Sequence, residues 1–297
     1  MRERAEWRGA LSVMAAIAGV GLSSGRELVL FFAQMKDAAW VGVAAACALF
    51  GLLTAFVAAQ GGDCPRRGGI ERLRELLRLL FAALVSAFML LRLGELGALT
   101  LPLRRGYLFG AGFGLLLALV LAWGKPGLPV TLGLAAFYCA NAMDGRPPRV
   151  YLSGATEFAL AGSTGAALAL ASVYAAMCGC ASLWSLRRLR EGTVRPAALG
   201  VKSAVLMALV LLPACAALLR GGDAVLVQPM PWVVLSARWG LEGFWLCAGL
   251  SALCAGATLS AALGFLLSRW RTEHRAAALF MLIGALAVFC VLSFGRI

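Results

Sequence analysis

The stretch from residue 19 to residue 27 places glycines, hydroxyls and charges inside an otherwise apolar segment. It reads Gly19-Val20-Gly21-Leu22-Ser23-Ser24-Gly25-Arg26-Glu27. Gly lowers helix stability by about 1 kcal/mol relative to Ala, and a charge at the bilayer centre costs about 2.5 to 3.5 kcal/mol. We therefore predict two half-helices joined by a break between Gly19 and Gly25. Unwound backbone at membrane depth is tolerated where it is buried in protein or lines a cavity, so the break indicates a central binding site.

The serine and the glutamate of this stretch have the spacing of a helix cap. Ser24 precedes Glu27 by three residues, as in a capping box, and we predict Ser24 as the N-cap of the outer half-helix. The positive end of that half-helix, at Ser24, Gly25 and Arg26, would receive an anionic group. Arg26 would either reinforce this preference or neutralise Glu27. In the plainer alternative the glycines are packing contacts and Glu27 is a capping residue paired with Arg26.

Two later segments carry polar groups that would face this centre. Segment 162–185 has a weakly polar patch, in which a second broken helix would lie opposite the first: Ser172, Tyr174, Met177, Cys178, Gly179, Cys180 and Ser182. Tyr174 and Cys178 are its candidate substrate contacts. Arg92 and Glu95 are intramembrane charges three residues apart, close enough to pair on one helix face. They form either a structural pair or a proton relay or substrate contact.

The composition places most of the protein surface in lipid. The chain has 297 residues, of which 62% are hydrophobic and 14% charged, and its mean hydropathy is +0.87. A soluble protein has about a quarter of its residues charged. The single histidine has no cysteine or second histidine nearby, and no set of nucleophile, base and orienting group is visible. We therefore expect an integral membrane protein that is not an enzyme, with no metal site and no cofactor.

Nine apolar segments, each near the ~20 residues that a membrane helix needs, are separated by short charged loops. We place them at 9–35, 39–60, 77–101, 107–123, 127–143, 162–185, 198–219, 240–268 and 276–294. The segments are continuously apolar, which excludes the alternation of a β-barrel. The prediction is an all-α polytopic helical bundle that forms a single transmembrane domain over residues 1–297.

The basic residues are distributed unevenly between alternate loops. Most of them fall on one side if the N-terminus is cytoplasmic, above all in the first residues, in loop 66–78 and in loop 187–195. This asymmetry predicts a multi-pass protein of the cell (inner) membrane with the N-terminus inside and, after nine spans, the C-terminus outside. The formal net charge of +13 is then a topology signal, and we expect no nucleic-acid partner.

The first motif resembles a known family. The run from Ala18 to Phe32 is similar to the first helix of the YkvI-like membrane proteins, whose pattern is approximately G-x-G-F-A-S-G-Q-E-x-x-x-F-F. Those proteins are similar to the amino acid, polyamine and organocation transporter superfamily, which has the LeuT fold. Stretches 172–183 and 230–264 resemble the sixth and eighth helices of the family. The sequence departs from the pattern at Arg26, where the family has Gln, and at Leu22-Ser23, where it has Phe-Ala.

This resemblance implies a LeuT-like inverted repeat with five and four helices. Repeat one would span about 9–143 and repeat two about 162–294, and repeat two would lack a tenth helix. The order of segments supports the same layout, since each set begins with a polar-interrupted helix and contains a longer helix after a short amphipathic stretch, at 70–77 and 228–237. A homodimer or a partner helix could cover the face that the tenth helix would leave exposed.

The resemblance also suggests a sodium site. The run Ala255-Gly256-Ala257-Thr258-Leu259-Ser260 is similar to the part of LeuT-type transporters that supplies oxygens to Na⁺ beside the broken helix. Thr258, with carbonyls of Gly19 or Leu22, would provide such ligands. Ala255 and Ser260 belong to the same candidate set, although Ser260 stands one position late. The alternative is hydroxyl bonding between helices, so coupling to Na⁺ stays open beside coupling to H⁺.

We therefore expect a secondary transporter of a small organic solute, amino acid or amine-like, that works by alternating access. The substrate-binding residues would be Gly19, Gly21, Ser23, Ser24, Gly25, Arg26, Glu27, Tyr174 and Cys178. The alternative is a non-transporting membrane sensor or scaffold with a degenerate transporter fold. The expected partners are the lipid bilayer and the small-molecule solute.

Overall fold

The part of the chain that the structure describes is built from helices and connecting turns. The computed structural model describes residues 2–60, 69–101, 106–124, 126–145, 163–186, 194–228 and 230–270, and these residues contain no β-strand. Apolar runs without alternation favour this outcome, because a helix satisfies its own backbone hydrogen bonds in lipid. The prediction of an all-α protein is confirmed for these residues.

Seven long helices follow the predicted segments closely. They are α3 (Ala39–Ala59), α4 (Gly69–Thr100), α5 (Gly106–Trp123), α6 (Gly127–Met143), α7 (Thr164–Leu186), α8 (Pro196–Gly221) and α11 (Gly240–Trp270). Helix α4 begins earlier than predicted, because the amphipathic stretch at 70–77 continues into the same helix. Helix α8 starts at a proline, which is favourable in the first turn because its N–H needs no helical partner there.

Six helical stretches in the described part are long and apolar enough to cross a membrane. They are Ala33–Ala59, Glu75–Thr100, Gly106–Trp123, Thr164–Leu186, Pro196–Gly221 and Pro231–Ser268. Helix α6 is apolar but shorter, and predicted segment 276–294 lies outside the described residues. Large apolar side chains on α5, including Phe113, Val120 and Trp123, are exposed, as expected of a surface that meets lipid.

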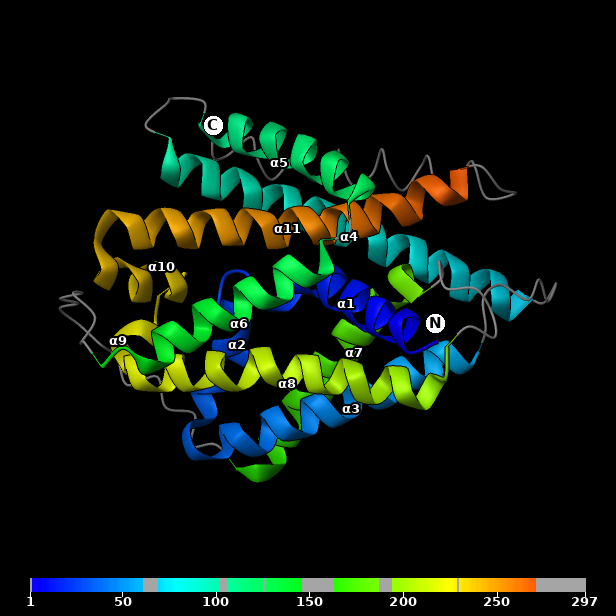
Figure 1. The fold of residues 1–297 in the computed structure, drawn as a ribbon, viewed down its shortest axis with the longest axis horizontal. Helices are drawn as coiled ribbons and strands as arrows, with labels where there is room; N and C mark the ends of the chain where they lie inside the picture. The colour runs from blue at the N-terminus through cyan, green and yellow to red at the C-terminus, as the bar shows by residue number, and fades with distance from the viewer. Residues whose placement is uncertain are drawn as a thin grey trace.

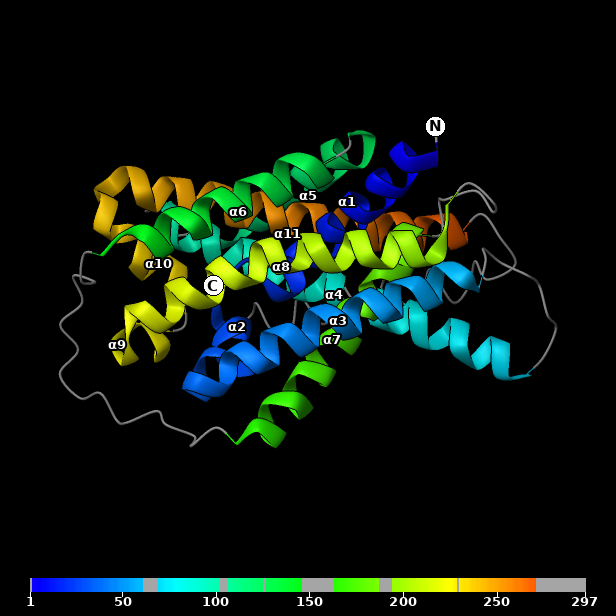
Figure 2. The same cartoon turned by 60° about the horizontal axis from the view of Figure 1, so that its bottom comes forward.

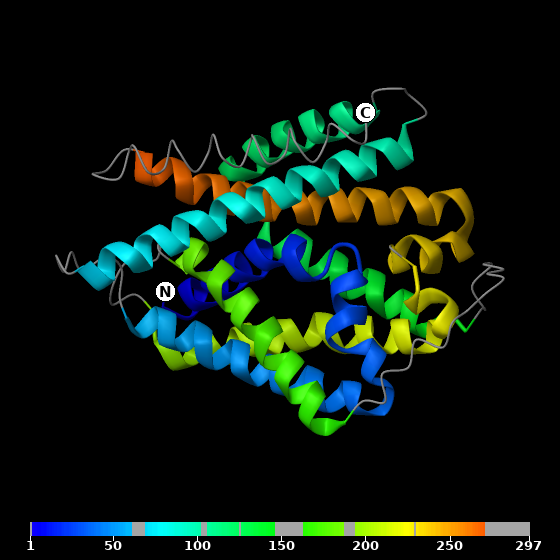
Figure 3. The same ribbon diagram turned by 180° about the vertical axis from the view of Figure 1, so that it is seen from behind.

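The long helices run roughly along the longest axis of the molecule, and consecutive ones alternate in direction (Figure 1). Helices α4, α5 and α11 pack together on one side, and α3, α7 and α8 on the other (Figures 1 and 3). Within the second group, α7 crosses α3 obliquely (Figure 2). Helix α1 (Arg2–Gly21) lies between the groups and contacts α11 on one side and α7 and α8 on the other. The alternation agrees with the predicted topology, while the orientation in a membrane stays a prediction.

The first predicted segment is divided, as its sequence indicates. Helix α1 ends at Gly21, α2 covers Arg26–Phe31, and the 3-10 helix η1 covers Ala33–Ala38 before α3 begins. The break therefore occupies residues 22–25, and Gly19 and Gly21 remain helical. The predicted break from Gly19 to Gly25 is correct in place but too long at its start, because these two glycines are helical and allow α4, α7 and α11 to approach α1 closely.

The expected second broken helix in segment 162–185 is wrong. The polar patch of the sixth segment does not interrupt a helix, since α7 continues from Thr164 to Leu186. Its hydroxyls bond within the helix instead: Ser172 Oγ donates to the carbonyl of Leu168, and Ser182 Oγ to the carbonyl of Gly179. The described helices thus contain a broken helix in the first segment without a broken counterpart in α7, and the inverted repeat stays a prediction.

Three short helices connect α8 to α11. They are α9 (Asp223–Leu226), α10 (Pro231–Ser236) and the 3-10 helix η2 (Ala237–Trp239). Gly222 precedes them with φ 74° and ψ 179°, and Gly240 follows them with φ 75° and ψ −154°. This backbone region is accessible almost only to glycine, so the two glycines determine where the connection begins and ends. Through it, α10 reaches the break in the first segment.

Candidate functional site

The break ends at Gly25, where α2 begins. This residue is the N-cap of α2 and has φ 80°, a left-handed conformation that glycine adopts at little cost. A Cβ atom placed here would lie 2.7 Å from Trp232 Nε1, so the close approach of Trp232 also requires glycine. Ser24 was predicted as the N-cap and instead lies one residue before it. Its Oγ still accepts the backbone N–H of Arg26 at 3.1 Å.

Three successive carbonyls at the break accept hydrogen bonds from side chains of other elements. The donors come from α7, α6, α10 and α11: Tyr174 Oη to Gly21 O (3.3 Å), Tyr138 Oη and Trp232 Nε1 to Leu22 O (2.5 and 3.1 Å), and Ser251 Oγ to Ser23 O (3.0 Å). An unpaired buried carbonyl is costly, so these side chains replace the helical bonds that the break gives up. The surrounding helices therefore hold the unwound backbone in one conformation.

Aromatic packing fixes these donors. The rings of Tyr138 and Trp232 stack with centroids 4.3 Å apart, and both residues are buried. Tyr174 is fully buried and contacts Phe31 and Phe32, with ring centroids 5.3 and 4.9 Å away. Such ring pairs add to burial by about 0.5 to 1.5 kcal/mol each. The predicted site residue Tyr174 thus reaches the break, and its hydroxyl binds backbone there.

Charged side chains form a chain beside the break. Ser24 Oγ donates to Glu27 Oε2, and Glu27 Oε1 lies 3.3 Å from Arg92 Nη2 on α4. Arg92 Nη1 lies 3.3 Å from Glu95 Oε2, so the guanidinium lies between two carboxylates. The spacing of Arg92 and Glu95 predicts their pairing, whereas the partnership of Arg92 with Glu27 was not predicted. Arg26 Nη1 donates to the carbonyl of Leu226 on α9, 2.9 Å away.

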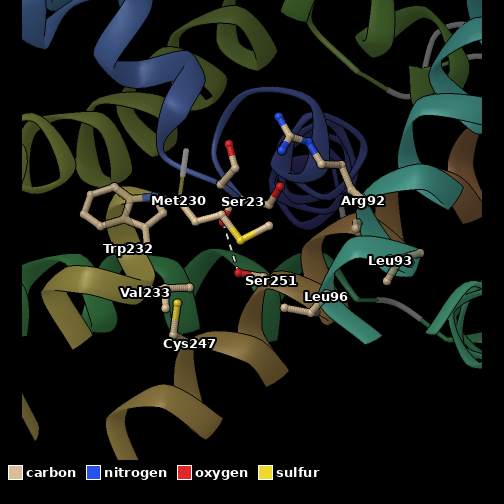
Figure 4. A pocket seen from close by; sticks show the side chains of 11 residues that line it. Ser23, Arg92, Leu93, Leu96, Met230, Trp232, Val233, Cys247 and Ser251 are labelled. Atoms are coloured by element: carbon tan, nitrogen blue, oxygen red, sulfur yellow. Dashed lines mark hydrogen bonds between the residues drawn. The ribbon is translucent and has the colours of Figure 1, made fainter. Parts of the chain in front are cut away.

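A cavity opens between the break, α4, α10 and α11 (Figure 4). Its volume is about 30 Å³, and it continues into an opening to the outside. Polar groups line it from the break and the neighbouring helices: Ser23, Ser24, Arg92 and Ser251. Apolar and sulfur-containing side chains complete it: Leu93, Leu96, Met230, Trp232, Val233, Cys247 and Ala255. A concave, largely apolar site with few polar groups is the usual form of a small-molecule site.

The candidate sodium ligands take part in hydrogen bonds between helices. Thr258 Oγ1 accepts the backbone N–H of Gly19 at 2.8 Å and donates to the carbonyl of Ala15 at 3.3 Å. The carbonyl of Gly19 accepts Ser23 Oγ at 2.9 Å, and that of Leu22 has the two donors described above. These bonds favour the alternative of hydroxyl bonding between α1 and α11. The sodium site stays a prediction.

The other predicted residues are distributed around this centre. Gly19 and Gly21 lie at the end of α1, where a Cβ atom on Gly21 would lie 2.6 Å from Tyr174 Oη. Ala255 lines the cavity, and Cys178 and Ser260 are buried. Residues that the sequence reasoning missed are Tyr138, Met230, Trp232, Cys247 and Ser251. The described residues hold no group of three His, Cys, Asp or Glu side chains that could bind a metal ion.

The class of the protein follows from the fold. The described chain is an all-helical protein with six helices long and apolar enough to span a membrane, as in a helical membrane bundle. A broken first segment crosses its centre beside a small cavity. Comparison with models of protein families, with curated proteins and with solved structures finds no match. The assignment of a function therefore depends on the site itself.

Proposed function

We propose that this protein is a secondary transporter that moves a small organic solute across the cell membrane by alternating access. The observation that carries the proposal is the break at residues 22–25, which lies at the wall of a cavity that also contains the Arg92 guanidinium. Discontinuous helices at the centre of a bundle are characteristic of secondary transporters, where they form substrate sites. The likeness of the first motif to the YkvI-like proteins, and through them to LeuT-fold transporters, belongs to the same proposal.

The two sides of the break supply what alternating access needs. Towards the N-terminus, α1 is buried between the two groups of helices, which seals that side in this conformation. On the other side, α10 forms one wall of the cavity and is part of a connection that begins and ends at glycines in unusual conformations. Such a connection can change its position by rotating at its ends, as hinges do. In this proposal α1 forms the closed side of the site, and the connection through α10 forms the side that opens.

The coupling ion is either H⁺ or Na⁺ in this proposal. Glu27 and Glu95 share Arg92 beside the cavity, and carboxylates in this position are the groups that proton-coupled transporters use. The sodium ligands expected at Thr258 would have to exchange their bonds with α1 for bonds to the ion. Because Thr258 Oγ1 is already hydrogen-bonded to α1, we favour H⁺ over Na⁺ as the coupling ion. The non-transporting sensor remains the alternative function, in which the cavity would bind a ligand without passage.

Uptake into proteoliposomes tests the proposal. Purified protein would be offered a panel of labelled amino acids, amines and small carboxylates, with and without pH and sodium gradients. We expect uptake of at least one class, and its loss in Glu27→Gln, which removes the charge that pairs with Arg92. Glu242→Gln is the matched control, because Glu242 is an exposed residue in the first turn of α11. Binding without uptake in wild-type protein would favour the sensor.

A further inference from the structure

We propose that the cavity beside the break takes a small monocarboxylate with an aliphatic body and discriminates against solutes that carry an ammonium group. The inference rests on the proposed function, because it names the solute class of the same site. It narrows the expected class from amino acids and amines to organic acids. Three observations carry it: the charge of the lining, the occupied carbonyls of the break, and the nature of the remaining wall.

The charged side chain among the lining residues is a cation. Arg92 reaches the cavity from α4 and points towards the break (Figure 4). A guanidinium carries five N–H donors, and its ion pairs with Glu27 and Glu95 each use one terminal nitrogen. The remaining donors suit the planar geometry of a carboxylate. Arg92 is therefore the group in the lining that can bind a charged solute, and the charge it binds is negative.

The two carboxylates beside Arg92 determine how an anion enters. Together with Arg92 they carry an excess of one negative charge, so a solute carboxylate that takes up the remaining donors of Arg92 requires one of the two to move away from the guanidinium. Glu27 is held by Ser24 and has 13% of its side chain exposed, whereas Glu95 has 27% exposed. Glu95 is thus the partner that can turn away at lower cost, because more of it already meets solvent. Arg92 then binds Glu27 and the solute.

An ammonium group finds a poor environment in the same cavity. It needs acceptors for three N–H groups, and the usual source in a broken helix is free carbonyl oxygen. Here the carbonyl of Leu22 accepts two side-chain donors and has no lone pair left, and those of Gly21 and Ser23 each accept one, so the break offers fewer acceptors than the three that an ammonium needs. The lining residues include no carboxylate. An ammonium in this cavity would lie nearest the Arg92 guanidinium, because Glu27 and Glu95 stay paired with that guanidinium outside the lining, so like charge and incomplete hydrogen bonding both disfavour it.

The rest of the wall selects the body of the solute. Leu93, Leu96 and Val233 present aliphatic groups, and Met230 and Cys247 present polarizable sulfur (Figure 4). Trp232 adds an indole ring. Thioether and aliphatic walls adapt to branched chains and offer no hydrogen bond to a hydroxyl or amide. A short, branched carboxylic acid matches the charge of Arg92 and the apolar character of the lining.

Three probes that share one branched five-carbon chain test this inference. Isocaproate is leucine without its amino group, isoamylamine is leucine without its carboxylate, and leucine carries both. Binding to purified full-length protein would be measured by calorimetry for each probe. We expect isocaproate to bind at least about tenfold more tightly than leucine, with isoamylamine showing no binding, because an unpaired buried ammonium costs more than one hydrogen bond contributes.

Variants on one helix assign the effect to Arg92. In Arg92→Gln the affinity for isocaproate should fall by at least about tenfold, because the variant loses a hydrogen bond to a charged group. Arg92→Lys keeps the charge without the planar fork and should bind with intermediate affinity. Arg78→Gln is the matched control, since Arg78 also belongs to α4 and pairs with a glutamate three residues away. It should bind isocaproate like wild type.

The outcomes separate this inference from the proposed function. Equal or tighter binding of leucine or isoamylamine overturns the inference, as does the absence of isocaproate binding to folded wild-type protein. An equal loss in Arg78→Gln and Arg92→Gln would also overturn it. Uptake of an amine without isocaproate binding would leave transport standing and this solute class rejected. Isocaproate binding without uptake would confirm the solute class and contradict transport.

Discussion

The two parts of the first segment satisfy their backbone in different ways. In α1, residues from Ala10 to Ala18 are helical and mostly buried, and packing between the two helix groups holds them in place. At the break, residues 22–25 give up helical bonds, and side chains from four other elements supply donors. The first part is held by its own helix and by apolar contacts. The second depends on polar contacts that are distant in sequence.

This difference underlies the proposed solute site. A packed helix offers no free polar groups, so we expect no solute to bind along α1 on the N-terminal side of the break. The break brings Ser23 and Ser24 to a cavity and positions Glu27 against Arg92. The cost of unwinding is offset by aromatic and hydroxyl donors, which leave the charged groups as the adjustable part of the site. Changes to either part should therefore have distinct consequences.

The largest effect is expected where the two parts meet, at Gly21. In Gly21→Leu the new side chain would overlap Tyr174, which is fully buried and bonds the carbonyl of the same residue. Overpacking of this kind costs about 1 to 3 kcal/mol. We expect a lower melting temperature in detergent and loss of isocaproate binding. Gly249→Leu is the control, because a Cβ atom there meets nothing within 4 Å; an equally stable Gly21→Leu would contradict the packing at the break.

The next effect concerns the carbonyl of Leu22, which has two donors. Tyr138→Phe or Trp232→Phe removes one hydrogen bond and should lower stability by about 1 kcal/mol. The double variant leaves a buried carbonyl without a donor, so its loss should exceed the sum of the two single losses. Unfolding in detergent would measure all three. Additive losses would show that the two donors do not act on one group.

A smaller effect is expected at Thr258, in the sealed part. Thr258→Val keeps the volume and removes the hydroxyl that joins Gly19 to Ala15. We expect a loss of about 1 kcal/mol in stability and isocaproate binding that is equal in sodium and potassium, before and after the substitution. Binding to the wild type that requires sodium, and no longer does so in Thr258→Val, would show that Thr258 is a sodium ligand.

The smallest effect lies at the start of α1, where a salt bridge ties it to α8. Lys202 Nζ lies 2.6 Å from Glu6 Oε2, and this hydrogen bond holds the pKa of Glu6 below its ordinary value of 4.5. Because the pKa is lowered on folding, the stabilisation is present above pH 4.5 and is lost as the pH falls through the lowered pKa. Glu6→Gln should therefore lower the melting temperature at pH ~7 and have less effect at pH ~3. An equal difference at both values would contradict this linkage.

The sequence was sufficient for the outline of this protein. Lipid forces each apolar segment to satisfy its own backbone, so composition and segment length predict the helices. The break was also predictable, because Gly, Ser, Arg and Glu are each costly within a membrane helix and here occur together. The pairing of Arg92 with Glu95 follows from their spacing on one helix. The ninth segment lies outside the described residues, and the inverted repeat stays a prediction.

The partners of the break were beyond the reach of sequence reasoning. Tyr138 and Trp232 lie more than a hundred residues from Leu22 in the chain, and their common target is a backbone oxygen with no sequence signal. Trp232 follows Pro231 in a short helix that is unremarkable in composition. The partnership of Glu27 with Arg92 did have a signal, because charges within membrane segments pair with one another. If all intramembrane charges had been considered as possible partners, and not only near neighbours in sequence, the ion pair of Glu27 with Arg92 would have been predicted.

One measurement tests most directly whether solute binds at the break while the middle of α1 is closed to solvent. In a background with the nine cysteines replaced by alanine that still binds isocaproate, single cysteines would be placed by Ser24→Cys and Ala16→Cys. Ser24 lines the cavity, and Ala16 is fully buried in α1. We predict that an anionic methanethiosulfonate reagent modifies the cysteine at position 24, that isocaproate protects it, and that the cysteine at position 16 stays unmodified. Modification at position 16, or none at position 24, would contradict the account.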